Sequence, residues 1–202
     1  MIGRWPLGHP IDAVGAYLRI LLELEEEQVP PRRARIVERM GHSWPRVSQV
    51  VAKLIRDGLV VTTEARGLAL SDLGRDRATA VLRKHRLAEL MLVEVIGVGF
   101  EDAHAEACRW QHVLSDAAER RIYELLGRPA RSPYGNPIPG LQALGVAAPD
   151  GGSDQQDRSL AAPDAVGEVT VARIGEGAQR DAALLRALRA AGQNPVSERQ
   201  ET

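Results

Sequence analysis

The sequence predicts a mainly α-helical protein that begins with a winged helix-turn-helix. Three segments with helical periodicity come first, and two short β-like segments joined by a turn follow them. Longer helical segments occupy the middle of the chain. Helix, helix, helix and hairpin is the element order of a winged helix, in which the hairpin forms the wing.

The first two helices are delimited by apolar spacing and by breaks in the pattern. The apolar residues of the first helix recur three and four positions apart: Val14, Tyr17, Leu18, Leu21 and Leu22. An acidic run, Glu23–Glu27, and the pair Pro30-Pro31 end this helix. A second helix is expected from Arg33 to about Met40, because Gly41-His42-Ser43 interrupts the periodicity there.

The third helix and the wing follow directly. Ser43 fits the N-cap of this helix, with Pro45 in its first turn. One side of the helix is apolar and the other is polar, so its polar side can meet a DNA groove. The β-branched stretch Leu59–Thr63 then predicts a strand, Arg66-Gly67 a turn, and Leu68–Leu70 a second strand.

The charge of the chain is concentrated in this region. Residues 30–86 contain 13 Lys or Arg against 5 Asp or Glu, a net charge of +8, whereas the whole chain has a net charge of −1. A basic helical domain with a wing indicates DNA as the partner. A protein-binding module with a basic surface is the alternative.

The rest of the chain is expected to be mostly helical. One long helix is predicted from Ser71 to about Val95 and another from Phe100 to about Leu126. The proline-rich segment Arg131–Gly140 is predicted to be an ordered, non-helical turn. Residues 147–163 have the composition of a flexible linker, after which a strand at Glu168–Ala172 and a helix at about Arg180–Ala191 are expected.

Candidate metal ligands lie on the two long helices. Along the second of them the positions 104, 108, 111 and 112 share one helical face, and they are occupied by His104, Cys108, Gln111 and His112. His85 and Glu89 form an i, i+4 pair on the preceding helix. Imidazole, thiolate and carboxylate together suit a first-row transition ion such as Fe(II), Co(II), Ni(II) or Zn(II). Packing in the core is the alternative role for any one of them.

The bulk composition narrows the remaining possibilities. A single cysteine excludes an intramolecular disulfide framework. No long uncharged apolar run and no secretory signal is evident, so a cytoplasmic protein without membrane contacts is expected. There is no Gly-rich loop or nucleophile motif, so an enzyme acting on a small-molecule substrate is not expected, although a metal held by His, Cys and Glu can activate water.

With these residues in view, the chain resembles the iron-dependent repressors, the diphtheria toxin repressor family, from about Ala13 to Ala191. Seven blocks carry the resemblance in order: Tyr17–Glu27, Arg33–Ile36, Val47–Ala52, Arg56–Val61, Arg83–Glu89, Glu106–Trp110 and Ser132–Gly140.

The resemblance implies a homodimeric repressor at palindromic operators. It implies a winged helix-turn-helix DNA-binding domain at residues 1–75 and a helical metal-binding and dimerisation domain at residues 76–146. After the linker it implies an SH3-like segment at residues 164–202, which we expect to be truncated because such a fold needs further strands.

The resemblance also assigns two metal sites. An ancillary site matches His85, Glu89 and His104 together with Glu176 and Gln179. The ligand set of this site is thus expected to be complete. The primary site matches Cys108 and His112, but Gln111 stands where the family has a glutamate and Ala16 where it has a methionine. We therefore expect Fe(II), with Co(II), Ni(II), Zn(II) or Mn(II) as substitutes, and a weakened response at the primary site.

DNA contacts are carried over in the same way. Residues matching positions near bases or phosphates are Ser43, Pro45, Ser48 and Gln49, and residues matching backbone contacts are Arg33, Ala34, Lys53, Arg56 and Arg66. Gln49 is the expected base reader. Trp44 and Arg46 depart from the family, which has glycine and threonine there, so we expect a different operator preference.

Two alternatives remain open. A metal-independent DNA-binding regulator of the same fold is favoured by Ala16 and Gln111. A zinc or manganese sensor is a variant within the family, although manganese members usually have an acidic residue at the position of Cys108.

Overall fold

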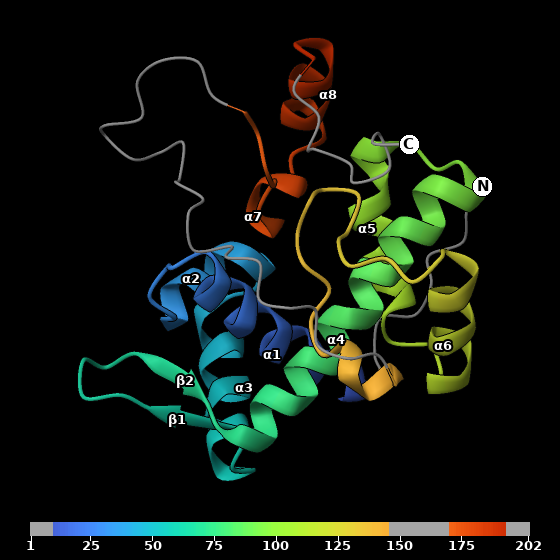
Figure 1. Cartoon of the computed structure of the whole chain (residues 1–202). Coiled ribbons are helices and arrows are strands. Elements are labelled where there is room, and N and C mark those ends of the chain that lie inside the picture. The colour runs from blue at the N-terminus through green and yellow to red at the C-terminus, as the bar shows by residue number, and fades with distance from the viewer. Residues whose placement is uncertain (1–9, 146–169, 193–202) are drawn as a thin grey trace, which may run out of the picture. The chain divides into compact units, whose positions relative to one another are not determined.

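The computed structural model of the chain describes residues 10–145 and 170–192 (Figure 1). The chain divides into two compact units, residues 1–82 and 83–202. The domain boundaries expected from the sequence stay predictions.

The first unit is a winged helix-turn-helix, as predicted. Its helices are α1 (Pro10–Glu26), α2 (Arg33–Met40), α3 (Trp44–Arg56) and the first part of α4 (Asp72–Leu90). Between α3 and α4, β1 (Val60–Thr62) pairs antiparallel with β2 (Leu68–Leu70), with Val61 opposite Ala69. The hairpin projects beside α3 (Figure 1).

The ends of these elements follow from local chemistry. Gly41 closes α2 in the left-handed conformation, with φ of 62°, which costs glycine little. Ser43 has the extended backbone of an N-cap and Pro45 lies in the first turn of α3, as expected, although the Ser43 side chain makes no capping hydrogen bond. Arg66 adopts a φ of 55° at the tip of the wing.

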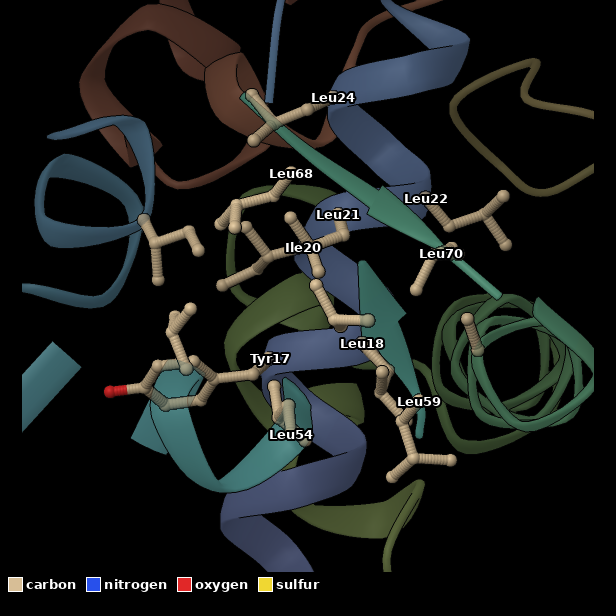
Figure 2. Packing of buried hydrophobic residues seen from close by; sticks show 14 of the residues in the cluster. Tyr17, Leu18, Ile20, Leu21, Leu22, Leu24, Leu54, Leu59, Leu68 and Leu70 are labelled. Atoms are coloured by element: carbon tan, nitrogen blue, oxygen red, sulfur yellow. The ribbon is translucent and has the colours of Figure 1, made fainter. Parts of the chain in front are cut away.

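The apolar face of α1 forms the centre of the first core. Tyr17, Leu18 and Leu21 are fully buried between α3 and the hairpin (Figure 2). From the wing, Leu59 and Leu68 pack into the same cluster. Figure 2 shows the Tyr17 ring at the edge of the cluster, with its hydroxyl pointing away from the leucines. The hairpin is thereby anchored to the three helices by buried leucines.

The second unit is helical. The later part of α4 continues as the π-helix η1 (Met91–Ile96). The other helices are α5 (Phe100–Trp110), α6 (Asp116–Leu125), the 3₁₀ turn η2 (Leu141–Leu144), α7 (Glu176–Gln179) and α8 (Ala182–Ala190). The long helix predicted from Ser71 to about Val95 is therefore present, but its final segment, Met91–Ile96, is π-helical.

The single helix predicted from Phe100 to Leu126 is wrong. The chain breaks after Trp110, and a new helix begins at Asp116. Ser115 has an extended backbone, and its hydroxyl accepts a hydrogen bond from the Ala118 N–H at 3.2 Å. This hydrogen bond satisfies a backbone N–H in the first turn of α6 that has no partner within the helix. A new helix starting at Asp116 is therefore favoured over continuation of α5.

The proline-rich segment is ordered and non-helical, as predicted. Arg131 and Pro137 form an isolated antiparallel bridge, and Tyr134 is fully buried. The Tyr134 hydroxyl donates to the Phe100 carbonyl at 2.6 Å. The Ile174 N–H donates to the Tyr134 carbonyl at 2.9 Å, so residues 170–175 lie against this segment.

The C-terminal predictions are met in part. α8 corresponds to the helix expected at Arg180–Ala191. The expected strand Glu168–Ala172 is wrong for Thr170–Ala172, which are in no strand, and Glu168 and Val169 lie outside the described residues. Residues 147–163, the expected linker, also lie outside them. Among the described helices, none has the length and apolar character needed to cross a membrane.

Candidate metal centre and nucleic-acid interface

Four candidate ligands from three helices meet inside the second unit. His85 and Glu89 lie one turn apart on α4, His104 lies on α5, and Glu176 is the first residue of α7. All four side chains are buried, and one ligand atom from each lies within 4.8 Å of the others. Residues 91 positions apart in the sequence thus form one polar cluster.

The distances within this cluster are those of direct polar contacts. Glu89 Oε1 lies 2.8 Å from His85 Nε2 and 3.1 Å from His104 Nδ1. Glu176 Oε2 lies 3.4 Å from each of these two nitrogens. The two imidazole nitrogens are 3.2 Å apart. Imidazole nitrogens and carboxylate oxygens therefore converge on one point, which is the arrangement that a bound cation requires.

Proton affinities in the cluster are strongly perturbed. Burial acts to raise the pKa of Glu89, but the charge of His85 and hydrogen bonds with both imidazoles outweigh it, and the pKa lies below its ordinary value. For Glu176 the same competition places the pKa well below its ordinary value. Burial acts to lower the pKa of His104, whereas hydrogen bonds with Cys108, Glu176 and Glu89 raise it well above the usual range. The ionised carboxylates are thus balanced by positive charge on imidazole.

Among the buried acceptor atoms of this region are some that have no hydrogen-bond partner among the described residues, which fits a cation ligand. Glu89 Oε2 and Gln179 Oε1 are two of them. Gln179 donates through Nε2 to the Ile174 carbonyl at 2.7 Å, which leaves the amide oxygen as its remaining polar atom. A buried acceptor without a partner is costly, and coordination of a cation removes that cost. The residues present therefore fit a divalent ion.

Arg86 supports the centre, and sequence reasoning missed it. Its side chain is 1% exposed, and Nε donates to Glu176 Oε1 at 3.1 Å. It also donates to the Pro137 carbonyl. Asn136 contributes from the same segment, donating to the Ile174 carbonyl at 2.8 Å. The run Arg83–Arg86 has the composition of a solvated basic surface, so no sequence signal separates Arg86 from its neighbours.

The second predicted ligand set lies at the C-terminal end of α5 and directly after it. Cys108 lies on α5, Gln111 caps its C-terminus, and His112 follows the end of the helix. Cys108 Sγ lies 3.7 Å from His104 Nε2, and Gln111 Nε2 lies 2.9 Å from His112 Nε2. Gln111 Oε1 is buried and accepts no hydrogen bond from the described residues. Ala16 lies on α1, in the first unit.

The predicted DNA contacts lie mostly on the exposed side of α3. Val47, Val51 and Leu54 are buried, and this leaves the opposite side to solvent. The exposed residues of that side are Ser43, Pro45, Arg46, Gln49, Lys53 and Arg56, with Ser48 half-buried. On α2, Arg33 is half-buried and Ala34 exposed, and on the wing Arg66 is exposed. Lys53 forms an exposed ion pair with Asp57.

Comparison with known families gives two matches that together cover most of the chain. Residues 12–68 match the model described as the iron dependent repressor N-terminal DNA binding domain. Residues 71–140 match the model described as the iron dependent repressor metal binding and dimerisation domain.

Individual relatives give the same result. The chain is 48% identical over 189 residues to the iron-dependent repressor IdeR of Mycobacterium tuberculosis (strain ATCC 25618 / H37Rv), covering 92% of this chain and 81% of that protein. It is 54% identical over 140 residues to the diphtheria toxin repressor of Corynebacterium diphtheriae, covering 69% and 62%. A solved manganese-dependent transcriptional repressor in complex with manganese is 32% identical, with a TM-score of 0.73 and coverage of 90% and 79%.

Proposed function

The chain belongs to the iron-dependent repressor family, and from this premise we propose that it represses transcription as a homodimer that binds palindromic operators under the control of a divalent transition ion. The observation that carries the proposal is the buried convergence of His85, Glu89, His104 and Glu176. Three of these residues lie in the stretch matched as metal binding, which supports the proposal.

Fe(II) is the proposed ion, with Co(II), Ni(II), Zn(II) and Mn(II) as substitutes. Imidazole nitrogens and carboxylate oxygens are ligands that all of these ions accept. The buried amide oxygen of Gln179, on the same short helix as Glu176, is proposed as a further neutral ligand. When bound, such an ion supplies positive charge and directed bonds that join α4, α5 and α7. His104 presents Nδ1 to this centre and Nε2 to Cys108, which fixes the orientation of its ring.

A second, weaker site is proposed at Cys108, Gln111 and His112. Its expected carboxylate is replaced by the neutral amide of Gln111, and the position of its expected methionine is Ala16, which has no ligand atom. Two of four side-chain ligands are thus weakened or lost. We propose that the buried centre, rather than this second site, carries the metal response.

The DNA face is proposed to combine base reading with phosphate contacts. Gln49 has both an amide donor and an acceptor, which suits a base edge in the major groove. The basic residues Arg33, Arg46, Lys53, Arg56 and Arg66 surround it on α2, α3 and the wing. Phosphate contacts give affinity without sequence information, so binding should weaken steeply as salt rises.

Operator binding with and without metal tests the proposal. Fluorescence anisotropy is measured without oxygen at fixed salt, with a family-type palindrome and a scrambled duplex, in the presence or absence of Fe(II) or Co(II). Metal is expected to tighten specific binding at least tenfold, about 1.4 kcal/mol of coupling. His85→Ala should abolish this response, because it removes a ligand of the buried centre. Cys108→Ser is the matched variant of the second site and should retain most of the response.

One rival has a specific observation in its favour. Ala16 and Gln111 depart from the family's activating site, which favours a metal-independent regulator of the same fold. Specific binding of the palindrome that is indifferent to metal would establish this rival. Equal loss of response in Cys108→Ser and His85→Ala would instead contradict the assignment of the response to the buried centre.

A further inference from the structure

Trp44 is an exposed tryptophan at the start of the helix proposed to enter DNA. It is the first residue of α3, and its side chain is 54% exposed. Other apolar side chains of the chain are equally exposed, so it is the place of Trp44 at the start of α3, rather than its exposure alone, that matters here. Within the described part of the chain the Trp44 side chain makes no hydrogen bond or ring contact, so its indole face and N–H are available to a partner.

The backbone that presents Trp44 is fixed on both sides. Before it, the Tyr17 hydroxyl lies 3.0 Å from His42 Nδ1, and Tyr17 is fully buried in α1. After it, Pro45 restricts the first turn of α3. The indole therefore projects from a turn tied to the core of the first unit, and DNA binding need not order a loop to use it.

The helix that begins at Trp44 presents exposed basic and polar residues. Arg46 is exposed two positions further on, and Gln49 and Lys53 follow along the same helix. In helix-turn-helix proteins the N-terminal residues of the second helix of the motif reach base edges in the major groove. An exposed indole at this N-terminus is thus placed where bases, rather than only phosphates, come within reach.

We propose that Trp44 is a specificity-determining residue that packs against the 5-methyl group of a thymine in the major groove. The inference rests on the proposed function, since it requires that α3 enters DNA. Base edges in this groove display polar atoms, and the thymine methyl is the apolar group among them. An indole face gains by covering a methyl group and gains little by covering a carbonyl or an amino group.

Replacement of thymine by deoxyuridine tests the contact, because it removes only the methyl group. A preferred duplex is first selected from a random-sequence library by the Co(II)-loaded protein. Each thymine of that duplex is then replaced in turn, and the dissociation constant is measured for the wild type and for Trp44→Ala. At one thymine in each half-site the replacement should weaken wild-type binding about fourfold, the factor that corresponds to burial of one methyl group. The same replacement should leave Trp44→Ala unchanged.

Leu73→Ala provides the matched control. Leu73 is 51% exposed in the first turn of α4, so the variant removes a comparable exposed apolar side chain from the same unit. It should keep the wild-type sensitivity to deoxyuridine. Equal sensitivity of the wild type and Trp44→Ala at every thymine would overturn the inference and leave the proposed function standing. Failure of the metal-loaded protein to select any duplex would overturn both.

Discussion

At the scale of single residues, the least expected feature is a fully buried arginine beside the candidate metal centre. Arg86 contacts Glu176, which itself lies among two histidines and a second carboxylate. A buried carboxylate without a compensating cation is strongly destabilising. Arg86 therefore holds Glu176 in place whether or not an ion is bound, and α7 remains attached through it.

Replacement of Arg86 by methionine should destabilise the second unit. The change keeps much of the side-chain volume but leaves Glu176 without its arginine, and the free energy of unfolding should fall by about 3 to 5 kcal/mol. Chemical denaturation of the metal-free protein measures it. Saturating Co(II) should reduce the deficit, because the ion returns positive charge to Glu176.

Arg121→Met is the control for this prediction. Arg121 is also paired with a glutamate, Glu124, but its side chain is 83% exposed. Exposed ion pairs contribute about 0 to 1 kcal/mol, so this variant should unfold close to the wild type. If Arg86→Met behaved like Arg121→Met, the buried pair would have no role in holding Glu176.

At the scale of elements, the centre depends on a close contact between the proline-rich segment and residues 170–175. Gly135 adopts a φ of 79°, and a β-carbon there would lie 2.2 Å from the Ala172 carbonyl oxygen. Only glycine permits this approach. The contact lies in the segment that leads into α7, and α7 carries Glu176 and Gln179.

Gly135→Ala should therefore weaken metal binding without changing any ligand. Displacement of residues 170–175 removes Glu176 and Gln179 from the centre, and Co(II) affinity measured by calorimetry should fall about tenfold to a hundredfold, as for other supporting changes around metal sites. Gly145→Ala imposes the same kind of backbone strain at φ of 83°, but nothing lies within 4 Å of its β-carbon. That variant should keep wild-type affinity, and an equal loss in both would point to strain alone.

Elements were predictable from the sequence where local chemistry decides them. The apolar spacing of α1, the Gly41 break and the wing turn at Arg66 are all short-range signals, and the winged helix follows from them. The break between α5 and α6 was missed because helical periodicity continues through it, while Ser115 acts as a cap only in its extended conformation. The strand expected at Thr170–Ala172 was inferred from β-branched composition. In the structure these residues lie against the proline-rich segment without forming a strand, because β propensity depends on tertiary context.

Helical spacing predicted His85, Glu89 and His104 as metal ligands, but Glu176 was predictable only with the family resemblance. The pair His85 and Glu89 has helical spacing, but nothing local connects it to Glu176. Arg86 and Asn136 had no signal at all, because their roles arise from the packing of segments far apart in the chain. Long-range polar contacts are set by the tertiary fold, whereas periodicity reports only on a single element.

At the scale of the whole molecule, a palindromic operator requires two copies of the DNA-binding unit. The second unit exposes large apolar side chains that a partner copy can cover, among them Val95 and Ile96 at the end of η1. They are 52% and 49% exposed. The matched family model describes this stretch of the chain as a dimerisation domain. We therefore expect η1 to lie in the interface between two copies.

Ile96→Asp should convert the protein to a monomer and weaken operator binding. A charge buried at the centre of an apolar interface is unpaired there, and loss of such an anchor typically costs about 2 kcal/mol or more of association free energy. Sedimentation equilibrium measures the oligomeric state, and anisotropy on the palindrome measures binding. Leu184→Asp places the same charge at a 40% exposed apolar position on α8 and should stay dimeric. A dimeric Ile96→Asp variant with wild-type operator affinity would exclude η1 from the interface, whereas monomers that still bind the palindrome tightly would show that each half-site is recognised independently.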